Sequence, residues 1–312
     1  MTTSEISEHL TDGPPRVVVD PGPVRGPRPG MTAAQREEFE REGFLILRGA
    51  LDDDEVRRYR AAVDRVHAEQ AARGTLGPDG SLHLLGAVGR CRDLVDLLDH
   101  PAAFPLVWSV LGWNVHVHHS HLDVHPEVVG ERGPWWHWHQ DGGRQNRELE
   151  TDPRPRMSVK LAYWLSDVRR TGRGNLTVVP GSHRTNWLDG PPRRDVPWSQ
   201  PAGAVQVTVE PGDVVFFDRR LWHARSLNRS DVVRKAVFVG YTYRWVRIRD
   251  EVADLPRTSW WSGLNPVQQQ LLGGVRPADG DHQWGHDPWT TPLYVALADQ
   301  GLLDPEHPPL IP

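Results

Sequence analysis

The stretch that decides the fold is "GDVVFFDRRLWHARSLNRSDVVRKAVFVGYTYR", residues 212–244. It contains two apolar runs, "VVFF" and "AVFVGY", separated by a polar segment that includes Asn and Asp. Short apolar runs between such turn residues are typical of antiparallel strands. Similar runs occur upstream from about residue 113, in "NVHVHHSHLDV", "MSVKLAYWLSD" and "NLTVVPG". We therefore expect a sandwich or jelly roll built from these strands.

The segments before residue 113 have the signals of helices. In "MTAAQREEFEREGFLILRG", Thr32 is a plausible N-cap, and Gly43 separates the helix from the short strand "FLIL". Residues 51–74 predict a second helix, with acidic residues at its start and a glycine at its end. Residues 91–112 predict a third, which prolines interrupt. The expected fold class is mainly β with flanking helices.

The domain organisation follows from length and composition. A chain of 312 residues fits one β domain with added helices. We interpret residues 1–30, rich in Pro and Gly, as a loosely ordered N-terminal arm and residues 31–312 as a single domain. Within it, residues 246–312 form a variable, Trp-rich C-terminal cover, placed over the cavity mouth or at a dimer contact. A homodimer is a further expectation.

The charge and the cysteine content narrow the function class. The chain has 36 Lys and Arg against 41 Asp and Glu, a formal net charge of −5. No overall positive field would attract nucleic acid or an anionic membrane, which favours small-molecule chemistry. Cys91 is the single cysteine and suits a reducing compartment. With neither a signal-like nor a membrane-spanning apolar run, we expect a cytoplasmic protein without membrane partners.

The segment "GPWWHWHQDGG", residues 133–143, carries a candidate metal site. His139 and Asp141 are two residues apart, so on an extended strand both side chains leave the same face. His223, in the stretch quoted first, supplies a second imidazole. Two His and one carboxylate hold non-haem Fe(II) with open positions for a co-substrate and O₂. Zinc also binds such ligands, but the usual hydrolytic HExxH helix is absent from the sequence.

Arg234 indicates which co-substrate the iron would use. It begins the strand "RKAVFVGYTY", which follows His223 after the turn "LNRSD". An antiparallel return would bring its guanidinium beside the iron. The distal carboxylate of 2-oxoglutarate requires a cation that binds it in a bidentate manner, and Arg has that geometry.

With these motifs in place, the chain resembles the phytanoyl-CoA dioxygenase family of Fe(II)/2-oxoglutarate oxygenases, including its ectoine-hydroxylase branch. The resemblance runs from Met31 to Trp245. It includes the N-terminal helix–strand–helix, "WHWHQDGG", "VKLAYWLSDVRRTGRGNLTVVPGSHR" and the stretch around His223. In this match His139, Asp141 and His223 fall on the iron ligands, and they are the expected catalytic residues.

The resemblance implies a double-stranded β-helix, a cupin-like jelly roll. It also implies an enzyme that uses Fe(II), 2-oxoglutarate and O₂ to hydroxylate an unactivated C–H bond, with release of succinate and CO₂. Related halogenases omit the carboxylate that Asp141 supplies here, which favours hydroxylation over halogenation. Desaturation, cyclisation and epimerisation begin with the same hydrogen abstraction and stay open, as does a non-catalytic ligand-binding member.

Further pocket residues follow from the resemblance and from strand alternation. The branch has an aromatic residue at Trp136 and polar pocket residues at His119 and Asp123. Lys160 lies on the strand "SVKLAYW" and could bind an anionic group. We assign Arg234, Asp123 and Trp136 to the cofactor, and His119, Trp138, Lys160 and Arg225 to the substrate. Arg225 replaces the family's small Ser. Five His on the strand "HVHHSHLDVH" divide between both faces, which argues against a second metal site.

The substrate is the least determined part of the reading. We expect a small metabolite or natural-product intermediate, which suits secondary metabolism, with an apolar surface and a polar handle. The segment "GGRQNRE" after Asp141 differs from the ectoine-hydroxylase branch and argues against ectoine itself. The arginines are scattered among acidic neighbours, so the sequence predicts no basic groove for a long acyl-CoA.

Overall fold

The computed structural model describes residues 26–27, 30–130, 138–142, 145–188, 200–274 and 291–304. The strands in chain order are β1 (Gly26–Pro27), β2 (Phe44–Leu47), β3 (Leu82–Leu85), β4 (Val115–His125), β5 (Ser158–Trp164), β6 (Leu176–Val178), β7 (Val205–Gln206), β8 (Val214–Asp218), β9 (His223–Arg225), β10 (Arg234–Tyr243) and β11 (Leu303–Asp304). The α-helices are α1 (Ala33–Glu42), α2 (Asp53–Ala72), α3 (Ala87–Arg90), α4 (Phe104–Leu111), α5 (Gln145–Glu148), α6 (Pro266–Leu271) and α7 (Pro292–Asp299). Short 3₁₀ helices are η1 (Arg92–Leu97), η2 (Ser182–Arg184), η3 (Leu255–Arg257) and η4 (Trp261–Gly263).

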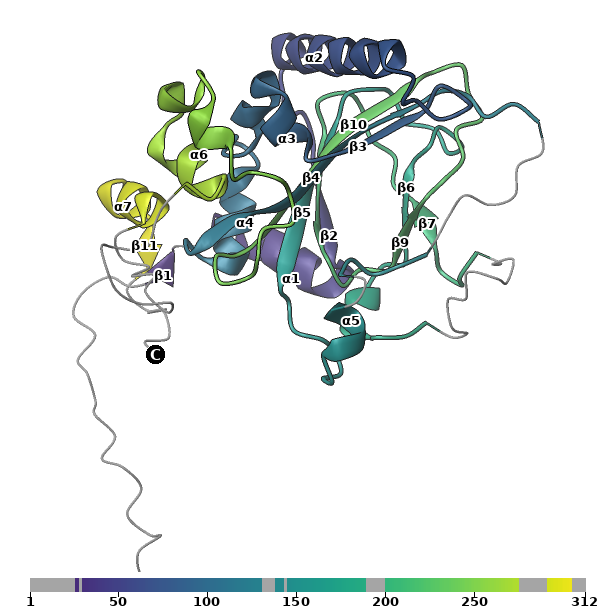
Figure 1. The fold of residues 1–312 in the computed structure, drawn as a ribbon. Helices are drawn as coiled ribbons and strands as arrows, with labels where there is room; N and C mark the ends of the chain where they lie inside the picture. The colour runs from purple at the N-terminus through teal and green to yellow at the C-terminus, as the bar shows by residue number, and fades with distance from the viewer. Residues whose placement is uncertain are drawn as a thin grey trace, which may run out of the picture.

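Two antiparallel sheets form the β core. The larger has the strand order β2-β8-β5-β10-β4-β3, and the smaller has the order β7-β6-β9. Figure 1 shows the smaller sheet opposite one side of the larger sheet, with α2, α3 and α4 toward its other side. This arrangement confirms the prediction of a mainly β jelly roll with flanking helices.

The first two helices lie where their sequences predict. Thr32 caps α1 and Asp52 caps α2, each through a capping box with the residue at N3. Helix α1 ends at Gly43, whose φ of 82° is costly for residues with a Cβ. The third predicted helix, over residues 91–112, is divided into η1 and α4. Pro101 lies between them and cannot donate a backbone hydrogen bond.

Strand β5 shows how alternation positions the site. Val159, Leu161 and Tyr163 belong to the apolar core shared with the helices. Ala162 and Trp164 instead pack with residues of the smaller sheet. Because successive side chains point to opposite faces, Lys160 lies on the same face as Ala162, between the two sheets.

Strand β4 changes its inward-facing residues partway along. Its pairing with β10 shifts register between Gly240 and Tyr241, where Gly240 pairs with His119 and Tyr241 with Val117. The extra residue in β4 reverses the alternation, since Val117 lies in the helix-side core before the bulge and Leu122 after it.

The bulge therefore corrects the expectation that the five histidines of this strand divide between both faces. After it, His119, His121 and Asp123 all lie opposite to Leu122 and line cavities between the sheets. His118, at the bulge, lines the larger cavity together with His119. Strict alternation would place these two adjacent side chains on opposite faces of the strand.

The described C-terminal segments pack beside β4. Gln270 on α6 donates to the carbonyl oxygens of Trp113 and Val115 and accepts from the backbone nitrogen of Leu293 on α7. Neither helix lines the cavities described below, whereas residues 247–249 line one of them. Among the described residues, no helix is long and apolar enough to cross a membrane.

Candidate metal centre and co-substrate pocket

Three potential metal ligands meet beside β9. One donor atom from each of His139, Asp141 and His223 lies within 4.8 Å of the others. Nε2 of His139 is 3.8 Å from Oδ1 of Asp141, and the two imidazole centroids are 4.2 Å apart. Two imidazoles and a carboxylate on one side of a common point fit a single divalent ion of the facial-triad type.

Backbone pairing holds these residues together across a long sequence separation. The backbone nitrogen of His139 donates to the carbonyl oxygen of His223, and the reverse bond is also made, each at 3.0 Å. The backbone nitrogen of Asp141 donates to the carbonyl oxygen of Arg219 at 2.8 Å. Residues 138–142 thus lie alongside the chain that leads into β9, so both sides of the triad rest on one hydrogen-bonded unit.

The environment of His223 favours metal binding. Its Nδ1 lies 2.8 Å from the carbonyl oxygen of Leu221, so Nδ1 carries the hydrogen and Nε2 keeps its lone pair. Burial, and then the nearby His139, lower the pKa of His223 to about 3. The ring is neutral at physiological pH and needs to lose no proton to bind a cation.

Lys160 forms an ion pair with the carboxylate of the triad. Its Nζ lies 2.8 Å from Oδ2 of Asp141, whereas Oδ1 is the oxygen nearer to His139. Burial by itself would raise the pKa of Asp141, but Lys160 and the two histidines hold it well below its usual range. The sequence predicted that Lys160 binds substrate. Its position next to Asp141 adds a positioning role, because it leaves one carboxylate oxygen for a metal.

We expect Lys160→Met to weaken Fe(II) binding by roughly tenfold, as is common when a residue that orients a metal ligand is lost. Methionine keeps much of the length but cannot hold Oδ2 of Asp141. Anaerobic Fe(II) titration measures the change, and Lys160→Arg should recover part of the affinity. Fe(II) binding as tight as in the wild type would contradict the positioning role.

Arg234 lies buried at the start of β10. Its Nη1 donates to Oδ2 of Asp123 at 2.9 Å, and its guanidinium carbon is 4.9 Å from the centre of the Trp164 ring. Its Nε is buried and has no hydrogen-bond partner within the described parts of the chain. A Cβ on Gly174 would lie 2.8 Å from Cδ of Arg234, so this glycine, with a φ of 73°, gives the arginine its space.

Arg234 and the triad share one cavity of about 370 Å³. An arginine with an unsatisfied buried nitrogen, in the same cavity as three metal ligands, fits a ligand that chelates a metal at one end and carries a carboxylate at the other. 2-Oxoglutarate has this form. Asp123 holds the guanidinium in place and neutralises it in part, a role close to the predicted cofactor contact.

A second group of potential ligands, His83, His121 and Asp123, lines the same cavity. Both oxygens of Asp123 are already engaged, Oδ1 with Nδ1 of His83 at 2.6 Å and Oδ2 with Arg234. These bonds favour a network that supports Arg234 over a second metal site. The sequence reading missed His83; its only signal was a histidine in the short apolar run "LHLL".

His125 extends this network and gives it a pH dependence. Burial lowers the pKa of His125 to about 4, although Asp123 opposes the shift. Between about pH 6.5 and pH 4 the unfolded chain binds a proton that the folded chain does not, so acidification destabilises the fold. We expect His125→Gln to reduce the pH dependence of the unfolding free energy by up to about 1.4 kcal/mol per pH unit in this window. Urea unfolding of metal-free protein at several pH values measures it, and an unchanged slope would contradict the assignment.

The other predicted residues occupy different places. His119 lines the cavity of Arg234, and its Nδ1 is 3.2 Å from Oδ1 of Asp250. Arg225 also lines it and contacts Nε2 of His125. Trp138 packs with Trp222 and Ala224 in a small apolar cluster, outside the lining of both cavities, so the cavities give no support to a substrate contact. Trp136 lies outside the described residues.

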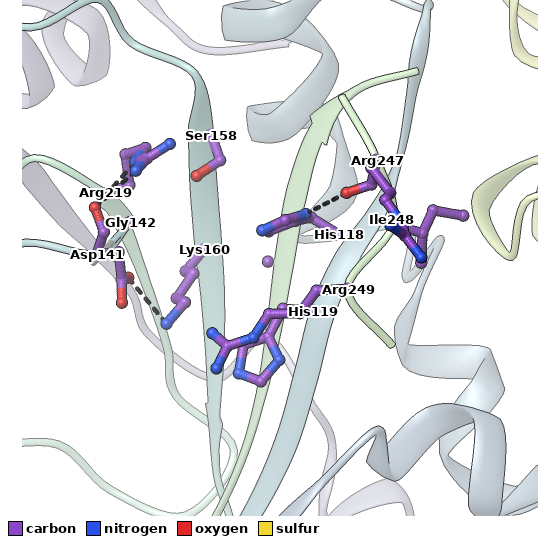
Figure 2. A pocket seen from close by; sticks show the side chains of 11 residues that line it. His118, His119, Asp141, Gly142, Ser158, Lys160, Arg219, Arg247, Ile248 and Arg249 are labelled. Carbon is purple, nitrogen blue, oxygen red and sulfur yellow. Dashed lines mark hydrogen bonds and ion pairs between the residues drawn. The ribbon is translucent and has the colours of Figure 1, made fainter. Parts of the chain in front are cut away.

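A second, larger cavity of about 540 Å³ adjoins the first. Asp141, Lys160, His119 and Arg249 line both cavities, so the ion pair at the triad lies between them. Figure 2 shows Lys160 reaching toward Asp141, with Arg249 beside His119. The larger cavity thus lies next to the candidate metal centre and is separate from the cavity that would hold the co-substrate.

Comparison with known proteins agrees with this geometry. The family model of phytanoyl-CoA dioxygenase (PhyH) matches residues 39–236, which include all three candidate ligands and Arg234. The chain belongs to the phytanoyl-CoA dioxygenase family. Among its relatives in this family, the ectoine dioxygenase of Bordetella bronchiseptica is 27% identical over 286 residues, which cover 80% of this chain and 86% of that protein. The peroxisomal phytanoyl-CoA dioxygenase of Mus musculus is 24% identical and covers 66% and 67%.

Solved structures show the same fold. EctD from S. alaskensis in its apoform matches with a TM-score of 0.56 and 24% identity, over 73% of this chain and 84% of that one. SnoK, described as a non-heme alpha ketoglutarate dependent carbocyclase from nogalamycin biosynthesis, matches with a TM-score of 0.53 and 24% identity, over 75% and 94%. These neighbours confirm the jelly-roll architecture of this member of the phytanoyl-CoA dioxygenase family.

Proposed function

We propose that the chain is an Fe(II)- and 2-oxoglutarate-dependent dioxygenase that hydroxylates an unactivated C–H bond of a small molecule. His139, Asp141 and His223 hold the iron, and Arg234 binds the distal carboxylate of 2-oxoglutarate. One observation carries the proposal. The three ligand side chains and the buried guanidinium line the same cavity, in a chain of the phytanoyl-CoA dioxygenase family.

The bound iron, 2-oxoglutarate and O₂ supply the oxidation, in which the co-substrate is converted to succinate and CO₂ while the substrate is hydroxylated. The protein provides the geometry. The neutral His223 presents Nε2, and Lys160 keeps Oδ2 of Asp141 occupied. Asp123 fixes Arg234, and Phe217 and Phe238 add apolar walls that reduce access of water.

Other oxidative outcomes share this machinery. Desaturation, cyclisation or epimerisation would use the same ligands and co-substrate, and a non-catalytic member would bind ligands without turnover. The carboxylate of Asp141 lies with the two histidines as a potential third ligand, and related halogenases omit it, which favours hydroxylation over halogenation. Residues that line the two cavities would contact the substrate. Localisation in the cytoplasm and formation of a homodimer stay predictions.

Anaerobic addition of Fe(II) and 2-oxoglutarate tests the proposal directly. The protein should develop the weak visible charge-transfer band of an iron-chelated keto acid, and O₂ should then release succinate when a substrate is present. A panel of small metabolites assayed for succinate would identify candidate substrates. Absence of the band in correctly folded protein would contradict an oxygenase and favour a ligand-binding member.

A further inference from the structure

The cavity next to the candidate metal is strongly cationic. Its lining includes four cationic side chains, Lys160, Arg219, Arg247 and Arg249, and a single carboxylate, that of Asp141. The sequence had suggested scattered arginines. The fold gathers them because residues 247–249 follow β10 directly and return along β4.

Two of these cations already have partners. Lys160 is paired with Asp141. Arg219 is buried and donates through Nε and Nη2 to the carbonyl oxygen of Asp141, and through Nη2 to Asn146. Both therefore support the metal centre itself. In contrast, the structure gives the guanidinium groups of Arg247 and Arg249 no ion-pair or hydrogen-bond partner among the described residues. Both residues line the cavity and are exposed.

The segment that carries these two arginines is fixed in place. The backbone nitrogen of Arg249 donates to the carbonyl oxygen of His118 at 2.8 Å, and Nδ1 of His118 lies 3.1 Å from the carbonyl oxygen of Arg247. Asp250 accepts from the backbone nitrogen and the hydroxyl of Ser120, at 2.7 and 2.6 Å. The carboxylate of Asp250 is therefore bound to β4 and is not paired with either arginine. Figure 2 shows Arg247 across the cavity from Asp141 and Arg219, with the side chain of Arg249 beside His119.

We infer that the substrate is a compact anion, whose carboxylate or phosphate group is bound by Arg249 together with Arg247. This inference rests on the proposed function and specifies its substrate class. Arg249, Asp141 and Lys160 line both cavities. An acid group bound to Arg249 would therefore place the substrate in the larger cavity, next to the candidate metal centre. A volume of about 540 Å³ suits a small metabolite. Arg234 remains available for 2-oxoglutarate in the other cavity.

The test uses two anion probes, inorganic phosphate and acetate, with the protein held anaerobic and loaded with Fe(II) and 2-oxoglutarate. Line broadening of the ³¹P signal of phosphate and the ¹³C signal of acetate reports binding. The variant R247Q/R249Q should weaken the binding of the preferred probe by at least about tenfold, since it removes charge-assisted hydrogen bonds. The anion that binds more tightly indicates whether the acid group of the substrate is a phosphate or a carboxylate. R249K alone should retain part of the affinity.

The control R73Q/R170Q removes the same charge from two exposed arginines outside both cavities and should leave anion binding unchanged. The visible band gives the affinity for 2-oxoglutarate in the same samples, and R247Q/R249Q should leave it within about twofold. Equal broadening in wild type and R247Q/R249Q, or broadening in neither, would overturn the inference. A tenfold weaker 2-oxoglutarate affinity would also overturn it, by placing the arginines at the co-substrate. Failure of the proposed function would be seen separately, because the wild-type protein would then lack the visible charge-transfer band of iron-chelated 2-oxoglutarate.

Discussion

The His223→Ala variant is expected to lose 2-oxoglutarate turnover while it retains the wild-type fold. His223 presents Nε2 to the triad because Nδ1 is bound to the carbonyl oxygen of Leu221. Alanine removes one of three ligands, and the remaining His139 and Asp141 cannot hold iron in the same geometry. We expect a loss of activity well beyond the roughly 10–100-fold that follows when a residue merely orienting a ligand is removed.

The measurements for this variant are succinate release and the visible band with Fe(II) and 2-oxoglutarate. Circular dichroism and thermal unfolding would show that the fold is kept, because the backbone pairing of His223 with His139 does not depend on the imidazole. His67→Ala is a matched control, since His67 lies on α2, bonds to the carbonyl oxygen of Gly80 and lines neither of the two cavities. Substantial turnover by His223→Ala would refute the ligand assignment.

The Arg234→Lys variant is expected to bind 2-oxoglutarate more weakly by about 1–3 kcal/mol, which is roughly 5- to 150-fold. Lysine keeps the positive charge, but a single ammonium cannot satisfy Asp123 and also present a planar pair of donors to a carboxylate. It would also lose much of the stacking of the guanidinium over Trp164. Titration of the anaerobic Fe(II) protein with 2-oxoglutarate measures the change through the visible band.

Two further variants distinguish specific binding of the distal carboxylate by Arg234 from a general effect of positive charge. Arg73→Lys, on the surface after α2, should leave the affinity for 2-oxoglutarate unchanged. Asp123→Asn should also weaken co-substrate binding, because the guanidinium would lose the carboxylate that fixes its orientation, while Fe(II) binding persists. An Arg234→Lys protein with wild-type affinity would show that another group binds the distal carboxylate.

Much of the fold and of the iron site could be predicted from the sequence because both depend on local patterns. The N-cap at Thr32, the acidic start of the second helix and the apolar runs of the strands each involve residues close in the chain. The expectation that His139 and Asp141 act together came from strand alternation alone. In the structure His139 forms an isolated bridge with His223 and Asp141 lies in a turn, yet the three side chains still meet.

Only the tertiary structure decided the partners of the charged residues and the character of the substrate cavity. The bulge in β4 sets which side chains of that strand line the cavities, and it is defined by pairing with β10. His83 reaches Asp123 through the pairing of β3 with β4, and Arg249 reaches the cavity because the chain returns along β4. Such contacts join segments far apart in sequence, and a shift of one residue in strand register would reverse them. The sequence by itself determined the ligand types and the strand that carries His223. Backbone pairing then decided which charged side chains meet around the metal centre.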